Sequence, residues 1–291
     1  MSRKLTCLLA LIHIVIALFQ APVFSASRAP VRGREAMVVS NSPVATDVGV
    51  EILRLGGNAV DAAVAVGFAL AVTHPAAGNI GGGGFMVLHM AENDEEYTLD
   101  YREKAPAAAG RDMYLDEDGD VVEGLSTDGY LASGVPGTVC GLHEAWKRFG
   151  ILPWKELVIP AVKLAEEGFE VSYALSESLK RGGGRMSVYP ESSRIFLRNG
   201  DYYREGEVFR QPELARTLSL IQEEGPDGFY KGRTARLIAE DMKGNGGLIT
   251  LEDLASYEAK FREPVRGNYR GLEIISMGPP SSGGTILVEM L

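Results

Sequence analysis

The sequence predicts an α+β fold, and three observations support this class. Two consecutive helices are expected near the N-terminus, over residues 43–55 and 59–72. Mostly apolar segments at 85–90 and 97–101, joined by a polar turn, predict an antiparallel hairpin. From Val135 onward the pattern is mostly helical. Helices and antiparallel strands that are segregated along a chain are typical of α+β proteins.

The two N-terminal helices have recognisable start and stop signals. Pro43 stands near the start of the first helix and Gly56 just past its end. Asn58 can cap the second helix, and Asp61 occupies the capping-box position three residues later. This second helix is Ala, Val, Leu and Phe nearly all round, which predicts a buried helix. It ends at His74, because a residue before proline avoids the α region.

The remaining elements are predicted from the same kinds of signal. Helices are expected over residues 136–149, 154–167, 173–180, 212–223, 232–242 and 250–257, and a strand over 272–275. A tight turn is expected at Asp118–Gly119, and Arg181–Arg185, which contains three glycines, is expected to be a loop. The loop at 278–284 leads into an apolar last segment, 285–291.

Composition excludes one class of partner. Of the 291 residues, 45% are hydrophobic and 23% are charged, as in ordinary globular proteins, and the net charge is −10. Nucleic-acid phosphates require clustered Lys and Arg, so we expect no nucleic-acid partner.

The N-terminus has the three parts of a secretory signal. Arg3 and Lys4 form a basic start, and Leu5–Phe19 is almost wholly apolar but shorter than the ~20 residues of a spanning helix. Val23 and Ser25 are small residues at the −3 and −1 positions of a cleavage site after Ser25.

This signal places the protein outside the cytoplasm, either periplasmic or secreted. Residues 1–25 are expected to be a signal peptide and residues 26–291 the exported domain. The alternative is an uncleaved signal anchor, which would keep the protein on the membrane. Cys7 would leave with the signal, and Cys140 alone cannot form an internal disulfide.

Two glycine- or acid-rich segments resemble ligand loops and fail on spacing. In the acidic run 116–120, Val121 and Thr127 stand where a calcium loop needs Gly and a bidentate Glu. Gly81–Gly84 precede a strand and have no Lys-Ser/Thr after them, which argues against a phosphate loop. Consecutive glycines can still let backbone approach backbone or a ligand closely.

Other cofactor and catalytic signatures are missing from the sequence. His74, His89 and His143 lack metal-ligand spacing, and no Gly-x-Ser-x-Gly nucleophile motif occurs. We therefore predict no metal site and no cofactor. Arg102 is a different candidate, because it follows a hairpin strand close to the glycine run. Its planar fork matches a carboxylate, although an ordinary surface ion pair is the competing interpretation.

Taken together, a set of ordered motifs resembles the γ-glutamyltransferase family, also called glutathione hydrolase. In chain order the motifs are Gly56–Ala63, Pro75, Gly81–Phe85, Asp100–Glu103 with Ala105–Pro106, Gly134–Gly137, Gly228–Gly232, Asp253–Tyr257 and Pro279–Gly284. The resemblance covers about residues 36–291. The order of the motifs makes the match specific, whereas any one of them alone would be weak.

The resemblance implies an N-terminal-nucleophile hydrolase fold, an αββα sandwich with two central antiparallel sheets between helical layers. It implies a zymogen that cuts itself ahead of a threonine, whose own α-amine then serves as base. That threonine attacks glutathione or another γ-glutamyl amide and forms a γ-glutamyl-enzyme, which water, an amino acid or a peptide then resolves. The position matching Arg102 binds the α-carboxylate of the substrate.

One departure from the family pattern is large. The family's nucleophilic Thr begins a Thr-rich motif in the downstream half of the precursor, and no such motif occurs before Leu291. The chain also ends inside an apolar segment without a cap or polar tail. We therefore expect a truncated large-subunit portion with an incomplete fold and no catalytic nucleophile, inactive alone and partnered by its own small subunit.

Two alternative functions remain open at this stage. The first is a cephalosporin or other amide acylase of the same superfamily, which Arg102 disfavours because it suits an α-amino-acid carboxylate. The second is a secreted protein that binds γ-glutamyl compounds without turnover.

Overall fold

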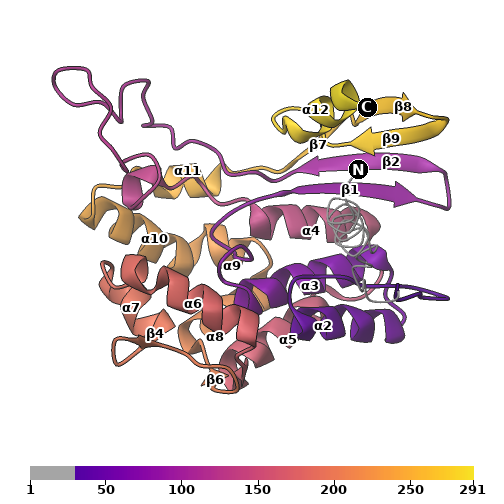
Figure 1. The fold of residues 1–291 in the computed structure, drawn as a ribbon, viewed down its shortest axis with the longest axis horizontal. Coiled ribbons are helices and arrows are strands. Elements are labelled where there is room, and N and C mark those ends of the chain that lie inside the picture. The colour runs from indigo at the N-terminus through magenta and orange to yellow at the C-terminus, as the bar shows by residue number, and fades with distance from the viewer. Residues whose placement is uncertain (1–29) are drawn as a thin grey trace, which may run out of the picture. The chain divides into compact units, whose positions relative to one another are not determined.

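The computed structural model describes residues 30–291, and the chain divides into two compact units, residues 1–37 and 38–291. The architecture below is that of the second unit (Figure 1). The predicted signal peptide, residues 1–25, lies outside the described residues. Among the residues that are described, no helix has both the length and the apolar character needed to cross a membrane.

The first two helices form where the sequence predicts them. They are α2 (Pro43–Arg54) and α3 (Ala59–Thr73). The Asn58 side chain accepts two N–H groups at the start of α3, and the Asp61 carboxylate accepts the Asn58 N–H at 3.0 Å. These reciprocal bonds are the predicted capping box.

Helix α3 is buried on nearly all sides, as its composition predicts. Phe68 is fully enclosed and meets the ring of Trp154 edge-on, with the ring centroids 5.5 Å apart. Helices α5 (Trp154–Glu167) and α8 (Pro212–Glu224) complete this core. The indole N–H of Trp154 donates to the carbonyl of Ile221 at 2.9 Å, so its polar group is satisfied inside the apolar cluster.

A three-stranded antiparallel sheet lies beside the helices. Its strands, in the order β1-β2-β7, are β1 (Phe85–Met90), β2 (Glu95–Asp100) and β7 (Lys260–Arg262). The predicted hairpin is therefore confirmed, and it gains a third strand from far along the chain. Helix α4 (Thr138–Phe149) lies along this sheet, between the sheet and α3 (Figure 1).

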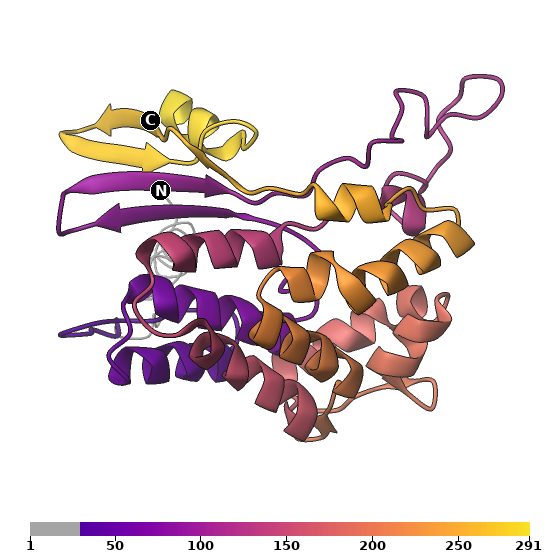
Figure 2. The same ribbon diagram turned by 180° about the vertical axis from the view of Figure 1, so that it is seen from behind.

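The C-terminal part of the unit is a hairpin followed by a helix. Strands β8 (Val265–Tyr269) and β9 (Leu272–Ser276) pair with each other, and α12 (Gly283–Met290) follows them. Both views place these elements on the side of the sheet away from α4 (Figure 2). An ion pair of 2.8 Å between Arg266 of β8 and Glu96 of β2 connects the hairpin to the sheet.

The other elements are short strands and further helices of the helical layer. They are η1 (Tyr130–Ala132), β3 (Phe169–Glu170), α6 (Tyr173–Met186), α7 (Pro190–Phe196), β4 (Leu197–Arg198), β5 (Asp201–Tyr202), β6 (Val208–Phe209), α9 (Asp227–Tyr230), α10 (Gly232–Gly244) and α11 (Leu251–Ala255). The turn predicted at Asp118–Gly119 is present, with Gly119 at a φ of 87° and a bridge between Leu115 and Val121.

The prediction of a loop at Arg181–Arg185 was wrong, because α6 continues as a helix to Met186. The glycines lower helix propensity, but tertiary packing overrides that cost. Leu175 and Leu179 bury one face of α6, and Met186 extends the same contact with the core in the last turn. The α+β class itself is confirmed.

Candidate functional site

Arg102 lies directly after β2 in an irregular segment that begins with an Asx-type turn at Asp100, and we call residues 100–103 the Arg102 turn. The Arg102 N–H donates to Oδ1 of Asp100 at 3.0 Å, a local side-chain-to-backbone bond typical of Asp in turns. The backbone of Tyr101 pairs with Gly84 in both directions, at 3.0 and 3.2 Å. The turn is therefore a direct continuation of the β1–β2 hairpin.

The glycine run before β1 packs against this turn. A Cβ placed on Gly83 would lie 2.4 Å from the carbonyl oxygen of Tyr101 and 2.9 Å from the carbonyl carbon of Arg102. A Cβ on Gly84 would lie 2.9 Å from the Tyr101 ring. Gly81, in contrast, has nothing within 4 Å of the same position. Gly83 thus allows backbone to approach backbone, which is one of the uses expected of the run, and Gly84 leaves room for the Tyr101 ring.

The guanidinium of Arg102 lies at an open cleft of about 710 Å³. Its side chain is 59% exposed, its Nε pairs with the Glu103 carboxylate at 3.2 Å, and it lies 5.8 Å from the centroid of the Phe85 ring. Asn79 and Ser133 contribute polar groups to the same cleft. Among the described residues no protein acceptor binds the terminal guanidinium nitrogens, so this fork is available to a carboxylate.

A distant segment, residues 253–262, holds the Arg102 turn, and we call it the anchoring segment. The hydroxyl of Tyr257 donates to the carbonyl oxygen of Arg102 at 2.8 Å. Oδ1 of Asp253 accepts the N–H of Ala107 at 2.8 Å, just beyond the turn.

The anchoring segment also pairs with β2 itself. Nε of Arg262 bonds to Oδ2 of the buried Asp100 at 2.7 Å, and the Thr98 hydroxyl donates to the Arg262 carbonyl at 2.6 Å. Asp100 therefore uses one carboxylate oxygen for the Arg102 N–H and the other for Arg262. The Arg102 turn is therefore held by side chains of two strands, Asp100 of β2 and Arg262 of β7.

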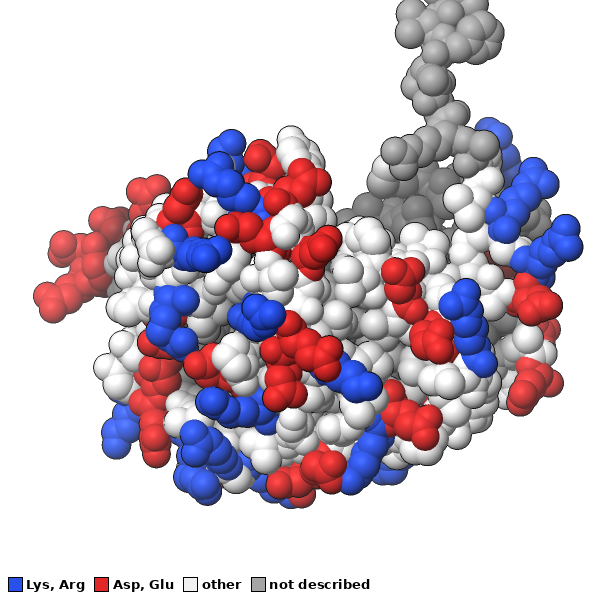
Figure 3. Space-filling view, turned by 90° about the horizontal axis from the view of Figure 1, so that it is seen from below, with Lys and Arg blue, Asp and Glu red and all other residues white. Residues whose placement is uncertain are grey.

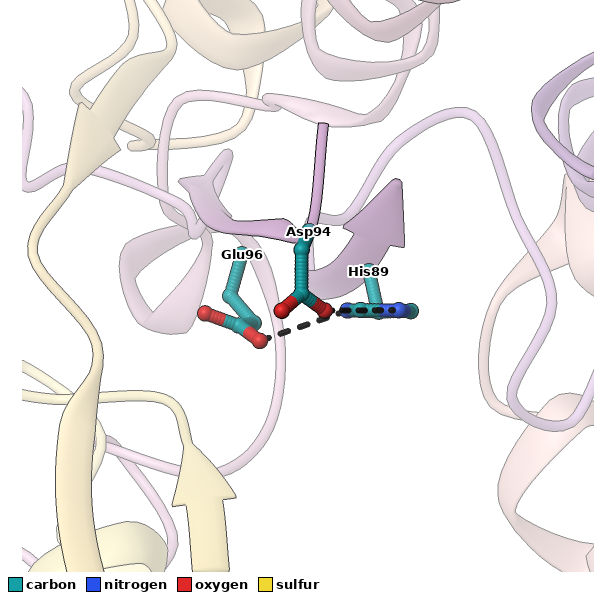
Figure 4. Close-up of side chains that lie close together, drawn as sticks. All are labelled: His89, Asp94 and Glu96. Carbon is teal, nitrogen blue, oxygen red and sulfur yellow. Dashed lines mark hydrogen bonds and ion pairs between the residues drawn. The ribbon is translucent and has the colours of Figure 1, made fainter. Parts of the chain in front are cut away.

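Three side chains near the turn between β1 and β2 are of the kinds that bind metal ions and lie close together. Ligand atoms of His89, Asp94 and Glu96 lie within 4.8 Å of one another (Figure 4). Asp94 is 94% exposed, and Glu96 is already bonded to the guanidinium of Arg266, which lowers the pKa of that carboxyl below its ordinary value. We assign this cluster to surface ion pairing, and the expectation of no metal site stays a prediction.

Charge on the surface is mixed. On the face of the described residues shown in Figure 3, Lys and Arg are interspersed with Asp and Glu. A nucleic-acid groove would gather positive side chains along one track.

Cys140 is a poor nucleophile, because burial raises the pKa of its thiol.

The motifs that surround the Arg102 turn match a known family. The model of the gamma-glutamyltranspeptidase family matches residues 45–291. The chain belongs to this family. The match includes the glycine run, the Arg102 turn and the anchoring segment in one alignment, as the ordered motifs predicted.

Individual gamma-glutamyltranspeptidase relatives agree with this assignment. The glutathione hydrolase proenzyme of Escherichia coli K12 is 51% identical over 263 residues, which cover 90% of this chain and 45% of that protein. The crystal structure of Helicobacter pylori gamma-glutamyltranspeptidase has a TM-score of 0.87 and 52% identity, and covers 89% of this chain and 74% of that chain. This likeness confirms the predicted N-terminal-nucleophile hydrolase fold.

The superfamily also includes a relative of different specificity. The Acylase ACY 1 proenzyme of Pseudomonas sp. strain SE83 is 40% identical over 274 residues, which cover 92% of this chain and 49% of that protein. This chain spans about half the length of the curated relatives that it matches.

Sequence reasoning located Arg102 and missed the residues that hold it. Tyr257 belongs to a motif that carried the family resemblance, but nothing in its neighbourhood indicated a partner 155 positions away. Arg262 stands in a three-residue strand that the sequence pattern does not predict. Pairing of β7 with β2 brings Arg262 to the Arg102 turn, and Tyr257 lies in the segment that leads into β7.

Proposed function

We propose that the complete protein is an exported γ-glutamyl acyltransferase and hydrolase, made as a self-cleaving precursor. Its donors are glutathione and other γ-glutamyl amides, and its acceptors are water, amino acids or peptides. Family membership supports the reaction class, and the exposed fork of Arg102 supports the donor class.

The observation that carries the proposal is the geometry of Arg102. A γ-glutamyl group carries an α-carboxylate and an α-ammonium at the end remote from the bond that breaks. The terminal nitrogens of Arg102 can bind that carboxylate through two parallel hydrogen bonds, and Glu103 beside it places a negative charge near the ammonium. Binding both groups fixes the orientation of the donor, and orientation is a large part of catalysis.

The attacking group is proposed to come from the downstream part of the precursor. A threonine freed by self-cleavage would carry its own α-amine as base, and its hydroxyl would attack the γ-carbonyl. The amine leaving group departs with a proton, and the ester left on the threonine passes its acyl group to water or an amine. In that sequence of steps, this chain would supply Arg102, the residue that binds the α-carboxylate of the donor.

Exposed apolar side chains support a small subunit as partner. Val87 of β1, Leu272 of β9, and Ile286 and Met290 of α12 are between 46% and 79% exposed. Helix α12 contacts β9, so three of these side chains belong to adjoining elements, and an exposed apolar patch is a common feature of an interface. We propose that the small subunit of the same precursor covers this surface.

Export is proposed from the N-terminal sequence. The basic start, apolar run and small-residue site of residues 1–25 support a periplasmic or secreted location. If the signal is retained, the same proposal becomes a membrane-anchored protein facing away from the cytoplasm.

The test uses the protein expressed from its complete reading frame. After self-cleavage it should release 4-nitroaniline from γ-glutamyl-4-nitroanilide, and an amino-acid or dipeptide acceptor should accelerate the release. A correctly cleaved protein that leaves this anilide intact would contradict the proposal.

The similarity to an acylase makes one rival specific enough to test. A glutaryl amide keeps the carboxylate that Arg102 would bind and lacks only the α-ammonium of the γ-glutamyl group. We expect kcat/KM to be higher for γ-glutamyl-4-nitroanilide than for glutaryl-4-nitroanilide. The reverse preference would assign the protein to the acylases.

A further inference from the structure

The contacts of the Arg102 side chain are too few to fix its position. It is 59% exposed, and its charged partner among residues 30–291, Glu103, is the next residue in the chain. An exposed side chain with a neighbouring partner retains considerable rotamer freedom. The place at which the guanidinium meets a substrate therefore depends on how firmly the Arg102 backbone is held.

Both backbone groups of Arg102 have side-chain partners. The N–H donates to Asp100 at 3.0 Å, a partner within the same turn. The carbonyl accepts from the hydroxyl of Tyr257 at 2.8 Å, a partner from the anchoring segment. Only the second of these two bonds ties Arg102 to a different part of the fold, through a side chain that stacks on Tyr230 of α9.

Tyr257 is itself rigid. Its side chain is buried, and its ring stacks on that of Tyr230 with the planes 4° apart and the centroids separated by 5.7 Å. The ammonium group of Lys104 lies 4.6 Å from the same ring. Burial raises the pKa of Tyr257 above its ordinary value, so the hydroxyl keeps the proton that it donates.

A glycine makes room for this bond. A Cβ on Gly137 would lie 2.1 Å from the Tyr257 hydroxyl oxygen and 2.1 Å from the Tyr101 carbonyl oxygen. A side chain at position 137 would therefore displace either the Tyr257 hydroxyl or the Tyr101 carbonyl. The Gly137 N–H donates to the carbonyl of Gly82 at 2.7 Å, which ties the glycine run to the same point.

We propose that Tyr257 is a positioning residue for donor binding, which acts by holding the carbonyl of Arg102 so that its guanidinium meets the α-carboxylate. The inference rests on the proposed function and extends it to a residue outside the cleft. Tyr257 is predicted to affect recognition of the carboxylate more than general activity.

The test compares two substrates that differ only in the group Arg102 would bind. 4-Aminobutyryl-4-nitroanilide has the ammonium of the γ-glutamyl compound and lacks its α-carboxylate. For the self-cleaved protein from the complete reading frame, we define the carboxylate preference as the ratio of kcat/KM for the γ-glutamyl anilide to that for the 4-aminobutyryl anilide. Tyr257→Phe should lower this preference about tenfold, the effect of one hydrogen bond, chiefly through a higher KM for the γ-glutamyl anilide.

Tyr230→Phe is the matched control. The Tyr230 ring is the stacking partner of Tyr257, and its hydroxyl donates to a different carbonyl, that of Pro136, at 2.9 Å. Both variants lose one buried hydroxyl from the same pair of rings, and the Tyr230 hydroxyl also accepts the Cys140 N–H at 3.3 Å, so Tyr230→Phe should lower thermal stability at least as much as Tyr257→Phe. Only Tyr257→Phe should lower the carboxylate preference, and an equal fall in Tyr230→Phe would assign Tyr257 a purely structural role.

A double variant separates this inference from the proposed function. In an Arg102→Ala background, Tyr257→Phe should have no further effect on the carboxylate preference, because its action passes through Arg102. A wild-type protein with a clear preference that Tyr257→Phe leaves unchanged overturns the positioning role alone. A wild-type protein without preference for the γ-glutamyl anilide overturns the proposed function and this inference together.

Discussion

The start of α3 and the Arg102 turn are built in opposite ways. At the start of α3, Asn58 and Asp61 cap each other, and Asp61 also accepts the N–H groups of Ile151 and Leu152 at 3.2 and 3.4 Å. At the Arg102 turn the decisive bonds come from the anchoring segment, more than 150 residues later. The first is a scaffold element whose helix cap is local in sequence, and the second is the proposed binding site, whose contacts come from distant parts of the chain.

The two regions also differ in burial. The capping box is a stable local arrangement that needs no substrate, and Asp61 is fully buried within it. The Arg102 turn leaves its guanidinium exposed and fixes only its backbone. A residue that binds a ligand needs an exposed side chain, so the contacts that hold its backbone in place have to come from other residues.

The largest effect is expected at the scaffold. Asp61→Ala removes a buried carboxylate that accepts several backbone N–H groups and leaves those donors unsatisfied. We expect the free energy of unfolding to fall by about 3 kcal/mol, measured by denaturant titration. Asp112→Ala, whose side chain is 68% exposed, should change it little. Equal effects of the two variants would contradict the role of the capping box.

A smaller effect is expected where the glycine run meets the Arg102 turn. Gly83→Ala would force a methyl group against backbone atoms that cannot move independently, so we expect a loss of about 2 kcal/mol. The variant should also raise KM for γ-glutamyl-4-nitroanilide. Gly81→Ala is the control for stability, because its new methyl group meets open space. A Gly83→Ala protein as stable as the Gly81→Ala protein would show that the packing is loose.

The smallest effect is expected from the titration of Asp253 in the anchoring segment. Burial raises the pKa of this carboxyl, but the bonds from the Ala107 N–H and from the Thr250 hydroxyl and N–H lower it by more. A carboxyl with a lowered folded-state pKa contributes stability above its ordinary pKa of about 4, and that contribution is lost as pH falls through the folded value.

The thermal midpoint measured from pH 6 down to pH 3 checks this titration. The wild-type midpoint should fall more steeply than that of Asp253→Asn, which cannot titrate but keeps an oxygen for Ala107. Parallel profiles for wild type and Asp253→Asn would contradict a stabilising role for the charge.

The sequence predicts helices and the first hairpin well, because their signals are local. Pro43, Asn58 and Thr250 mark helix starts that the structure confirms. Strand β7 is missed because three residues with little apolar pattern become a strand only by pairing with β2. The helix through Arg181–Arg185 is missed because packing of Met186 against the core outweighs three glycines.

In the candidate site, too, some features have local sequence signals and others do not. Arg102 can be proposed from sequence, because an Arg after a hairpin strand and near a glycine run is an unusual local pattern within the family motifs. Its cleft, its exposure and its partner Tyr257 depend on contacts between segments distant in sequence. Those contacts are products of the fold and cannot be derived from local patterns.

Arg102 is proposed to recognise the donor through its α-carboxylate, and a comparison of two substrates measures this recognition. The carboxylate preference, defined above, is measured for the wild-type protein and for Arg102→Ala, both from the complete reading frame and both self-cleaved. Loss of a charge-assisted, two-bond contact predicts a fall of about 100-fold in this preference, with the 4-aminobutyryl anilide hydrolysed at a nearly unchanged rate. If Arg102→Ala keeps the wild-type preference, another residue binds the carboxylate and the account of this site is wrong.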